Sequence, residues 1–288
     1  MSRLEQGQGE LLRNPAKRFL EFKNMYSKEE VTIKGKTKEV KVFDKCGFNW
    51  SEKVGEEWVQ NFVELPLEFA VLNGDWVNFK GWSETEKCKY WSNEVKTADD
   101  LISIRNKDGI VYEFTLNQMW GKVKGSTVKD EAMSKKVKAD LKGLNVKQHS
   151  SIYVAIKNEE TEEFELINLQ IKGANLSGVK DTPTPPSGWW NFSKKYKSGN
   201  SLYTNYVQIN DWTVEDGELG EYGVLNFTLG SKISADENEE IETLYQEMEA
   251  YHKFYTDKPK ETVVEAEKVL AAANVDEDDE PDEEKLPF

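Results

Sequence analysis

One nine-residue segment combines the two side-chain types that a protein needs to bind single-stranded nucleic acid. Four aromatic residues and three lysines fall within it: Trp189, Trp190, Phe192, Lys194, Lys195, Tyr196 and Lys197. Bases stack on aromatic rings, which contributes about 1–3 kcal/mol per base, and lysines neutralise the phosphates. The preceding Pro- and Gly-rich residues 181–188 are typical of a loop. We expect this segment to lie on the surface as a binding site, since a loop-borne Trp–Trp pair among lysines is awkward to bury.

A second cluster of aromatic residues and lysines lies earlier in the chain. It consists of Trp82, Lys87, Lys89, Tyr90 and Trp91, and Tyr203 is a further candidate for stacking on bases. The alternative for each aromatic residue is a place in the hydrophobic core, with the lysines as ordinary solvated charges. That alternative is favoured for any single aromatic ring, whereas the composition of 189–197 as a whole favours the surface.

The segments around these clusters have the pattern of a β-rich body. Alternating apolar and polar residues predict hairpins at 31–43 and 101–116, and a strand–turn–strand unit at 63–82 that turns at Asn73–Asp75. Further strands are expected at 150–158, 164–173, 201–212 and 222–229. Many short strands with little helix indicate a barrel or a sandwich, and periodicity does not choose between them.

Helices are expected in three places. Asn14 and Pro15 are a start signal for a short helix that extends to Phe22. Residues 130–142 are amphipathic, and residues 237–255 carry their apolar side chains on or near one face. The last helix is expected to pack on the body or against another chain, which would make the protein a homodimer.

Charge divides the chain unevenly. Most of the formal net charge of -15 lies after Ala235, and the residues before it are close to neutral. We therefore divide the chain into a flexible arm (1–12), a β-rich nucleic-acid-binding domain (13–235), a C-terminal helix (236–258), and a linker with an acidic tail (259–288). The net negative charge of the chain comes mainly from its C-terminal region, so it does not argue against nucleic-acid binding by the body.

The segment 276–288, DEDDEPDEEKLPF, holds eight acids and one lysine. Such a run cannot bury enough apolar surface to offset the entropy of ordering, so we expect it to be disordered. Its last residues, Leu286, Pro287 and Phe288, are apolar and suit capture by a partner with an apolar pocket and a basic rim. The plainer alternative is a tail that only keeps the protein soluble.

This segment resembles the C-terminal tip of bacterial and phage single-stranded DNA-binding proteins, which is an acidic run followed by an apolar residue, proline and phenylalanine. Lys285, directly before the apolar residue, departs from the bacterial pattern. The resemblance implies an elaborated OB-type β-barrel that coats single-stranded DNA without sequence preference during replication, recombination and repair. It also implies that the tail recruits a polymerase, helicase or primase. The residues that would do so are Asp282, Glu283, Glu284, Leu286, Pro287 and Phe288.

Signals for other functions are weak. The sequence contains no phosphate-binding loop, dinucleotide fingerprint, zinc-protease helix or nucleophile elbow, so we expect neither an enzyme nor a cofactor. Cys46 and Cys88 stand far apart, and His149 and His252 stand alone, so no metal site is expected. No apolar run approaches the roughly 20 residues of a membrane span, and a cytoplasmic protein is expected, in the host if phage-encoded. The alternative function is a protein-interaction or virion-associated β module with a solubilising tail.

Overall fold

The computed structural model describes residues 14–33, 36–55, 57–123, 125–179, 188–217 and 220–257. The strands are β1 (Arg18–Ile33), β2 (Lys36–Val54), β3 (Glu57–Val63), β4 (Leu67–Ser83), β5 (Cys88–Ser92), β6 (Leu101–Asn106), β7 (Gly109–Thr115), β8 (Val146–Lys157), β9 (Phe164–Lys172), β10 (Asn205–Gly217) and β11 (Gly220–Lys232). The helices are α1 (Leu116–Met119), α2 (Glu131–Gly143), α3 (Ala174–Ser177), α4 (Trp189–Lys197), α5 (Ser201–Thr204) and α6 (Ala235–Asp257). The predicted mainly β body with a C-terminal helix is confirmed. The arm 1–12 and the linker and tail 259–288 lie outside the described residues.

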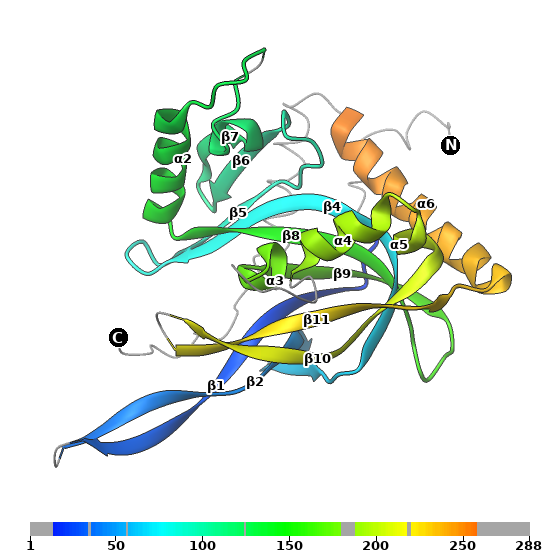
Figure 1. Ribbon diagram of the computed structural model, residues 1–288, viewed down its shortest axis with the longest axis horizontal. Coiled ribbons are helices and arrows are strands. Elements are labelled where there is room, and N and C mark those ends of the chain that lie inside the picture. Colours follow the sequence, from blue (N-terminus) through cyan, green and yellow to red (C-terminus); the bar gives the residue numbers. More distant parts are fainter. Residues whose placement is uncertain are drawn as a thin grey trace.

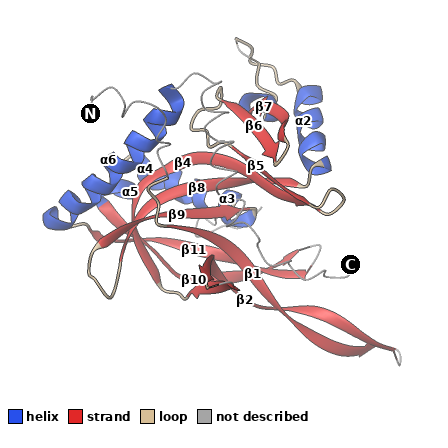
Figure 2. Cartoon of the chain, turned by 180° about the vertical axis from the view of Figure 1, so that it is seen from behind, coloured by secondary structure: helices blue, strands red, loops and turns tan. Residues whose placement is uncertain are grey.

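The strands form one sheet in the order β3-β2-β1-β9-β8-β4-β5-β6-β7, and β10 joins it through β4. All neighbouring strands are antiparallel except β1 and β9, which are parallel over Arg18–Glu21. β4 organises the sheet, because its first residues pair with β10, its middle with β8 and its last with β5. Figure 2 shows β4, β8, β9 and β1 side by side.

The main core lies inside the curl of this sheet. Buried apolar side chains from β1, β2, β4, β8, β9, β10 and β11 meet there, and α3, α4 and α5 add Leu176, Trp189, Phe192 and Leu202. Figure 1 shows these three helices on one side of β8 and β9. The helices therefore cover one face of these strands.

The sheet nearly closes on itself where β11 lies against β2. At this seam a Cβ on Gly223 would lie 2.2 Å from Cys46 Sγ, and the Gly223 N–H donates to Asn24 Oδ1 at 3.0 Å. Burial raises the pKa of the Cys46 thiol to about 12. Among the described strands no backbone ladder joins β11 to β2, so the sheet is open and the expected OB-type barrel is not established.

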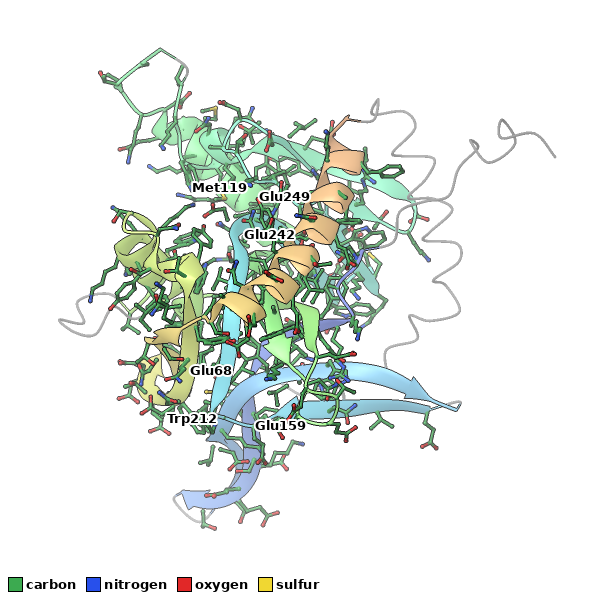
Figure 3. The ribbon with its side chains drawn as sticks, turned by 90° about the vertical axis from the view of Figure 1, so that its right-hand side faces the viewer. Glu68, Met119, Glu159, Trp212, Glu242 and Glu249 are labelled. Carbon is green, nitrogen blue, oxygen red and sulfur yellow. The ribbon has the colours of Figure 1, made fainter. Side chains whose placement is uncertain are left out.

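Two further cores attach to this body. The end of β4 packs with β5, β6, β7, α1 and α2 into a separate lobe, seen at the upper left of Figure 1. On the face of the sheet opposite α3–α5, α6 packs Ile241 and Met248 against Trp76 and Tyr153. Figure 3 shows α6 crossing in front of β4, with Glu242 and Glu249 along its length. The predicted helix 237–255 is confirmed, and it packs on the body.

Several expected elements are confirmed, and three are wrong. The hairpins at 31–43 and 101–116 form as β1–β2 and β6–β7, and 130–142 forms α2 behind the N-cap Asp130. Residues 14–22 are not helical, because Leu20 and Phe22 alternate into the core as part of β1. Asn73–Asp75 is no turn but an irregularity in the β4–β8 register, and 189–197 is a helix, not a loop.

Candidate nucleic-acid interface

The cluster around Trp82 lies where β4 and β5 pair. Trp82 is directly opposite Lys89, and Lys80 is directly opposite Trp91, so these four side chains share one face of the sheet. Trp82 is 44% exposed, and Lys89 is exposed beside it. Tyr90 points to the other face and is buried in the lobe core at 2% exposure. Strand alternation thus keeps two tryptophans of this cluster on the surface and removes the tyrosine from it.

The same face continues across β8, β9 and β1. Lys147 lies opposite Lys80, Lys172 lies opposite His149, and the parallel register places Phe19 and Lys23 on this face of β1. Phe19 is 44% exposed. We call the resulting surface the basic–aromatic stripe: Phe19, Lys23, Lys80, Trp82, Lys89, Trp91, Lys147 and Lys172. Its strands face the viewer in Figure 2, on the side away from α3 and α4.

Three lysines of the stripe differ in their partners. Lys172 pairs with Glu21 at 2.7 Å, whereas Lys80 donates to the neutral carboxamide of Gln170 and Lys147 is exposed. Burial alone would raise the pKa of Glu21, but the nearby His149, at 3.7 Å, and the charge and hydrogen bond of Lys172 outweigh it and hold that pKa well below its usual range. Burial lowers the pKa of His149, so the imidazole is neutral at pH 7. Lys172 is therefore the cation that balances Glu21.

A buried polar network supports the middle of the stripe. The Glu94 carboxylate accepts from Ser151 and, at 2.7 Å, from the hydroxyl of Tyr153. Asn78 adds a longer contact of 3.3 Å to the same carboxylate. Beside this network the rings of Trp76 and His252 stack at 3.8 Å, which anchors α6 at the border of the stripe. A network of this kind, on the same face as the stripe, fixes β4 and β8 in one arrangement.

The cluster 189–197 divides differently, because it forms the helix α4. Trp189 is fully buried, and its indole N–H donates to the Gly74 carbonyl at 3.1 Å. Phe192 is also buried, at 1% exposure. The expectation that these two rings stack on bases is therefore wrong for the folded protein, since both belong to the main core.

The other side chains of α4 give a smaller surface. Trp190 is 38% exposed, and Lys194 and Lys195 are exposed near it. Tyr196 is partly buried against the core with Lys195 over its ring, and Lys197 pairs with Asp75. Tyr203 is partly buried next to Lys197, and its own burial raises its pKa. This surface lies on the opposite side of the sheet from the stripe, so the two expected clusters do not meet (Figure 1).

The remaining expected site residues fall outside the stripe. Lys87 is exposed in the β4–β5 turn and pairs with Glu84 at 2.8 Å. The tail residues Asp282, Glu283, Glu284, Leu286, Pro287 and Phe288 lie outside the described residues. Conversely, sequence reasoning missed Phe19, Lys23, Lys80, Lys147 and Lys172. Their alternation was visible, but only the strand register shows that they share one face.

Within the described part of the chain, no cluster of three or more His, Cys, Asp or Glu side chains could hold a metal ion. In the same residues, no helix is both long and apolar enough to cross a membrane. Comparison with protein families, curated proteins and solved structures finds no significant match. The stripe therefore has to be interpreted from its own geometry.

Proposed function

We propose that the protein binds single-stranded DNA along the basic–aromatic stripe, without sequence specificity, in DNA replication, recombination and repair. The observation that carries this proposal is the placement of exposed aromatic rings and lysines on one continuous face of β5, β4, β8, β9 and β1. Stacking on rings such as Trp82 does not depend on base identity, because every base has a π-face. Lysines such as Lys147 supply the sequence-independent attraction to phosphates.

The length of the stripe suits a short segment of nucleic acid. Five adjacent strands span four interstrand spacings of about 4.8 Å, or roughly 19 Å. At the stacked spacing of about 3.4 Å per nucleotide this accommodates about five nucleotides. Single domains with OB-type barrels bind about 4–16 nucleotides, so the stripe has the extent of one such site. The finer assignment of the curled sheet to the OB class belongs to this proposal and is supported by its near closure at β2 and β11.

The resemblance of 276–288 to the tips of single-stranded DNA-binding proteins supports a second part of the proposal. In it, the acidic segment recruits replication proteins such as a polymerase, helicase or primase. The charge division supports the same assignment, because an acidic segment and a basic stripe within one chain give DNA and protein partners separate surfaces.

The test is a titration of the full-length protein with oligo-dT, followed by tryptophan fluorescence at low and high salt. We expect strong quenching as bases stack on Trp82 and Trp91. The affinity should fall as salt rises, with a log–log slope of about −0.7 per neutralised phosphate. A protein-interaction module would give no quenching at either salt concentration, also after removal of residues 276–288, and that result would overturn the proposal.

A further inference from the structure

A cavity of about 300 Å³ lies between α2 and the start of β8. Its floor is apolar and is made by Phe79, Met119, Leu141 and Val146. Lys138 and Lys142 of α2 and Lys147 of β8 line it and are exposed. This volume is at the lower end of the range of about 300–1,000 Å³ for ligand pockets, so the cavity has room for one small ligand and not for an extended chain.

The polar group at the wall of this cavity lacks a protein partner. Gln148 lines the cavity, and its Nε2 is buried without a hydrogen-bond acceptor in the described part of the chain. Leaving a buried donor unpaired is unfavourable, so a ligand that supplies an acceptor here would be stabilised. Rotation of the carboxamide about its last torsion can present either its donor or its acceptor to a ligand.

The cavity lies at the same ends of β4 and β8 as part of the basic–aromatic stripe, but on the other face of these strands. Asn145, which lines it, donates from Nδ2 to the backbone carbonyl of Trp82 at 2.8 Å. Gly81 packs so closely here that a Cβ would lie 2.2 Å from the Asn145 carbonyl oxygen. Lys147 is among the residues around the cavity, but strand alternation directs its side chain to the stripe face, opposite to Val146 and Gln148.

We propose that this cavity binds a single nucleotide. The base covers the apolar floor and pairs with the Gln148 carboxamide, and the phosphate lies between Lys138 and Lys142. A purely apolar ligand would leave Gln148 unpaired, and an inorganic anion would leave the floor uncovered. The nucleotide is either free or one unit of a bound strand, and the second source rests on the function proposed above.

The first arm of the test measures the binding of radiolabelled deoxythymidine monophosphate to the full-length protein by equilibrium dialysis. We expect binding that is weakened at least tenfold by Lys138→Glu with Lys142→Glu and at least threefold by Gln148→Leu. Lys135→Glu is the matched control, because Lys135 is exposed on the same helix but does not line the cavity. It should change the affinity less than twofold.

The second arm uses oligo-dT carrying one photoreactive 5-iodouracil, followed by mapping of the crosslinked peptide. Crosslinks at Met119, Leu141 or Gln148 without binding of the monophosphate support the proposal and assign the base to a bound strand. Another outcome is neither monophosphate binding nor a crosslink in the cavity, while oligo-dT still binds and Trp82→Ala still weakens that binding. This result would overturn the cavity assignment and leave the proposed function intact. Loss of all oligo-dT binding overturns the proposed function, and the dialysis arm still decides the cavity.

One competing occupant has to be tested directly. An acidic peptide with the sequence of residues 276–288 also matches an apolar floor with basic neighbours. Binding of that peptide, abolished by Lys138→Glu with Lys142→Glu, together with no nucleotide signal in either arm, would overturn the assignment of the cavity to a nucleotide.

Discussion

Two regions that both combine aromatic residues with lysines, 82–91 and 189–197, have opposite structural fates. In the first, the strand period of two places Trp82, Lys89 and Trp91 on one face and buries Cys88 and Tyr90 on the other. In the second, the helical period buries Trp189 and Phe192 in the main core. Aromatic–lysine composition therefore shows that a segment is amphipathic, and the secondary structure decides which aromatic rings remain available to a ligand.

The largest expected effect is on stability and concerns Trp189. Trp189→Ala should lower the free energy of unfolding by about 3–5 kcal/mol, because it opens a cavity in a fully packed core and leaves the Gly74 carbonyl without its donor. Urea denaturation followed by circular dichroism measures it. The matched control is Trp82→Ala, which removes an exposed ring and should cost well under 1 kcal/mol. Equal losses for the two variants would mean that the regions do not differ as the structure shows.

The next effect is on DNA affinity. Here we expect the larger loss from a substitution in 82–91 and the smaller loss from one in 189–197. Trp82→Ala should weaken oligo-dT binding by about 1–3 kcal/mol, or roughly 5- to 150-fold, through loss of one stacked base. Trp190→Ala, on the exposed side of α4, is the matched control and should change the affinity less than twofold. Fluorescence anisotropy with labelled oligo-dT measures both. A larger loss for Trp190→Ala would transfer the binding face to α4.

Lysine substitutions in the two regions should differ in how they change the salt dependence of DNA affinity. Lys147→Ala should weaken oligo-dT binding severalfold and make the slope of log affinity against log salt shallower by about 0.7, the value for one phosphate contact. Lys195→Ala on α4 should leave the slope unchanged. The measurement is a set of anisotropy titrations at four salt concentrations. An unchanged slope for Lys147→Ala would remove that residue from the DNA path.

Much of the fold could be predicted from the sequence, because local patterns determine hairpins and helices. The β6–β7 hairpin, α2 and α6 follow from alternation, capping and helical period. The turn predicted at Asn73–Asp75 is wrong. Its residues favour turns locally, but tertiary packing keeps them within β4 as a register irregularity. A Cβ on Gly74 would lie 2.5 Å from Trp189, a residue far away in the sequence.

The candidate site was less accessible to prediction, since its residues come from five strands that are scattered along the chain. Trp82, Lys89 and Trp91 could be found because they are close in sequence. Phe19 and Lys172 join them only through the parallel register of β1 and β9, which no local pattern specifies. A surface assembled across strands therefore needs the strand order before its composition can be recognised.

The smallest expected effect concerns the ion pair that holds Lys172 in the stripe. Because the pKa of Glu21 is lower in the folded than in the unfolded protein, the carboxylate stabilises the fold above its unfolded pKa of about 4.3. This stabilisation is lost as the pH falls further towards the folded pKa. Glu21→Gln should cost below about 1 kcal/mol at pH 7, since both partners are about one-third exposed.

Urea denaturation between pH 7 and pH 3 checks this, and the difference between Glu21→Gln and the unmodified protein should shrink below about pH 4. The same variant frees Lys172, so it should strengthen oligo-dT binding slightly at low salt. Glu39→Gln is the matched control, because Glu39 pairs with Lys28 at 3.4 Å on the β1–β2 hairpin, away from the stripe. Tighter DNA binding by Glu39→Gln as well would show that total charge, and not the stripe, governs the affinity.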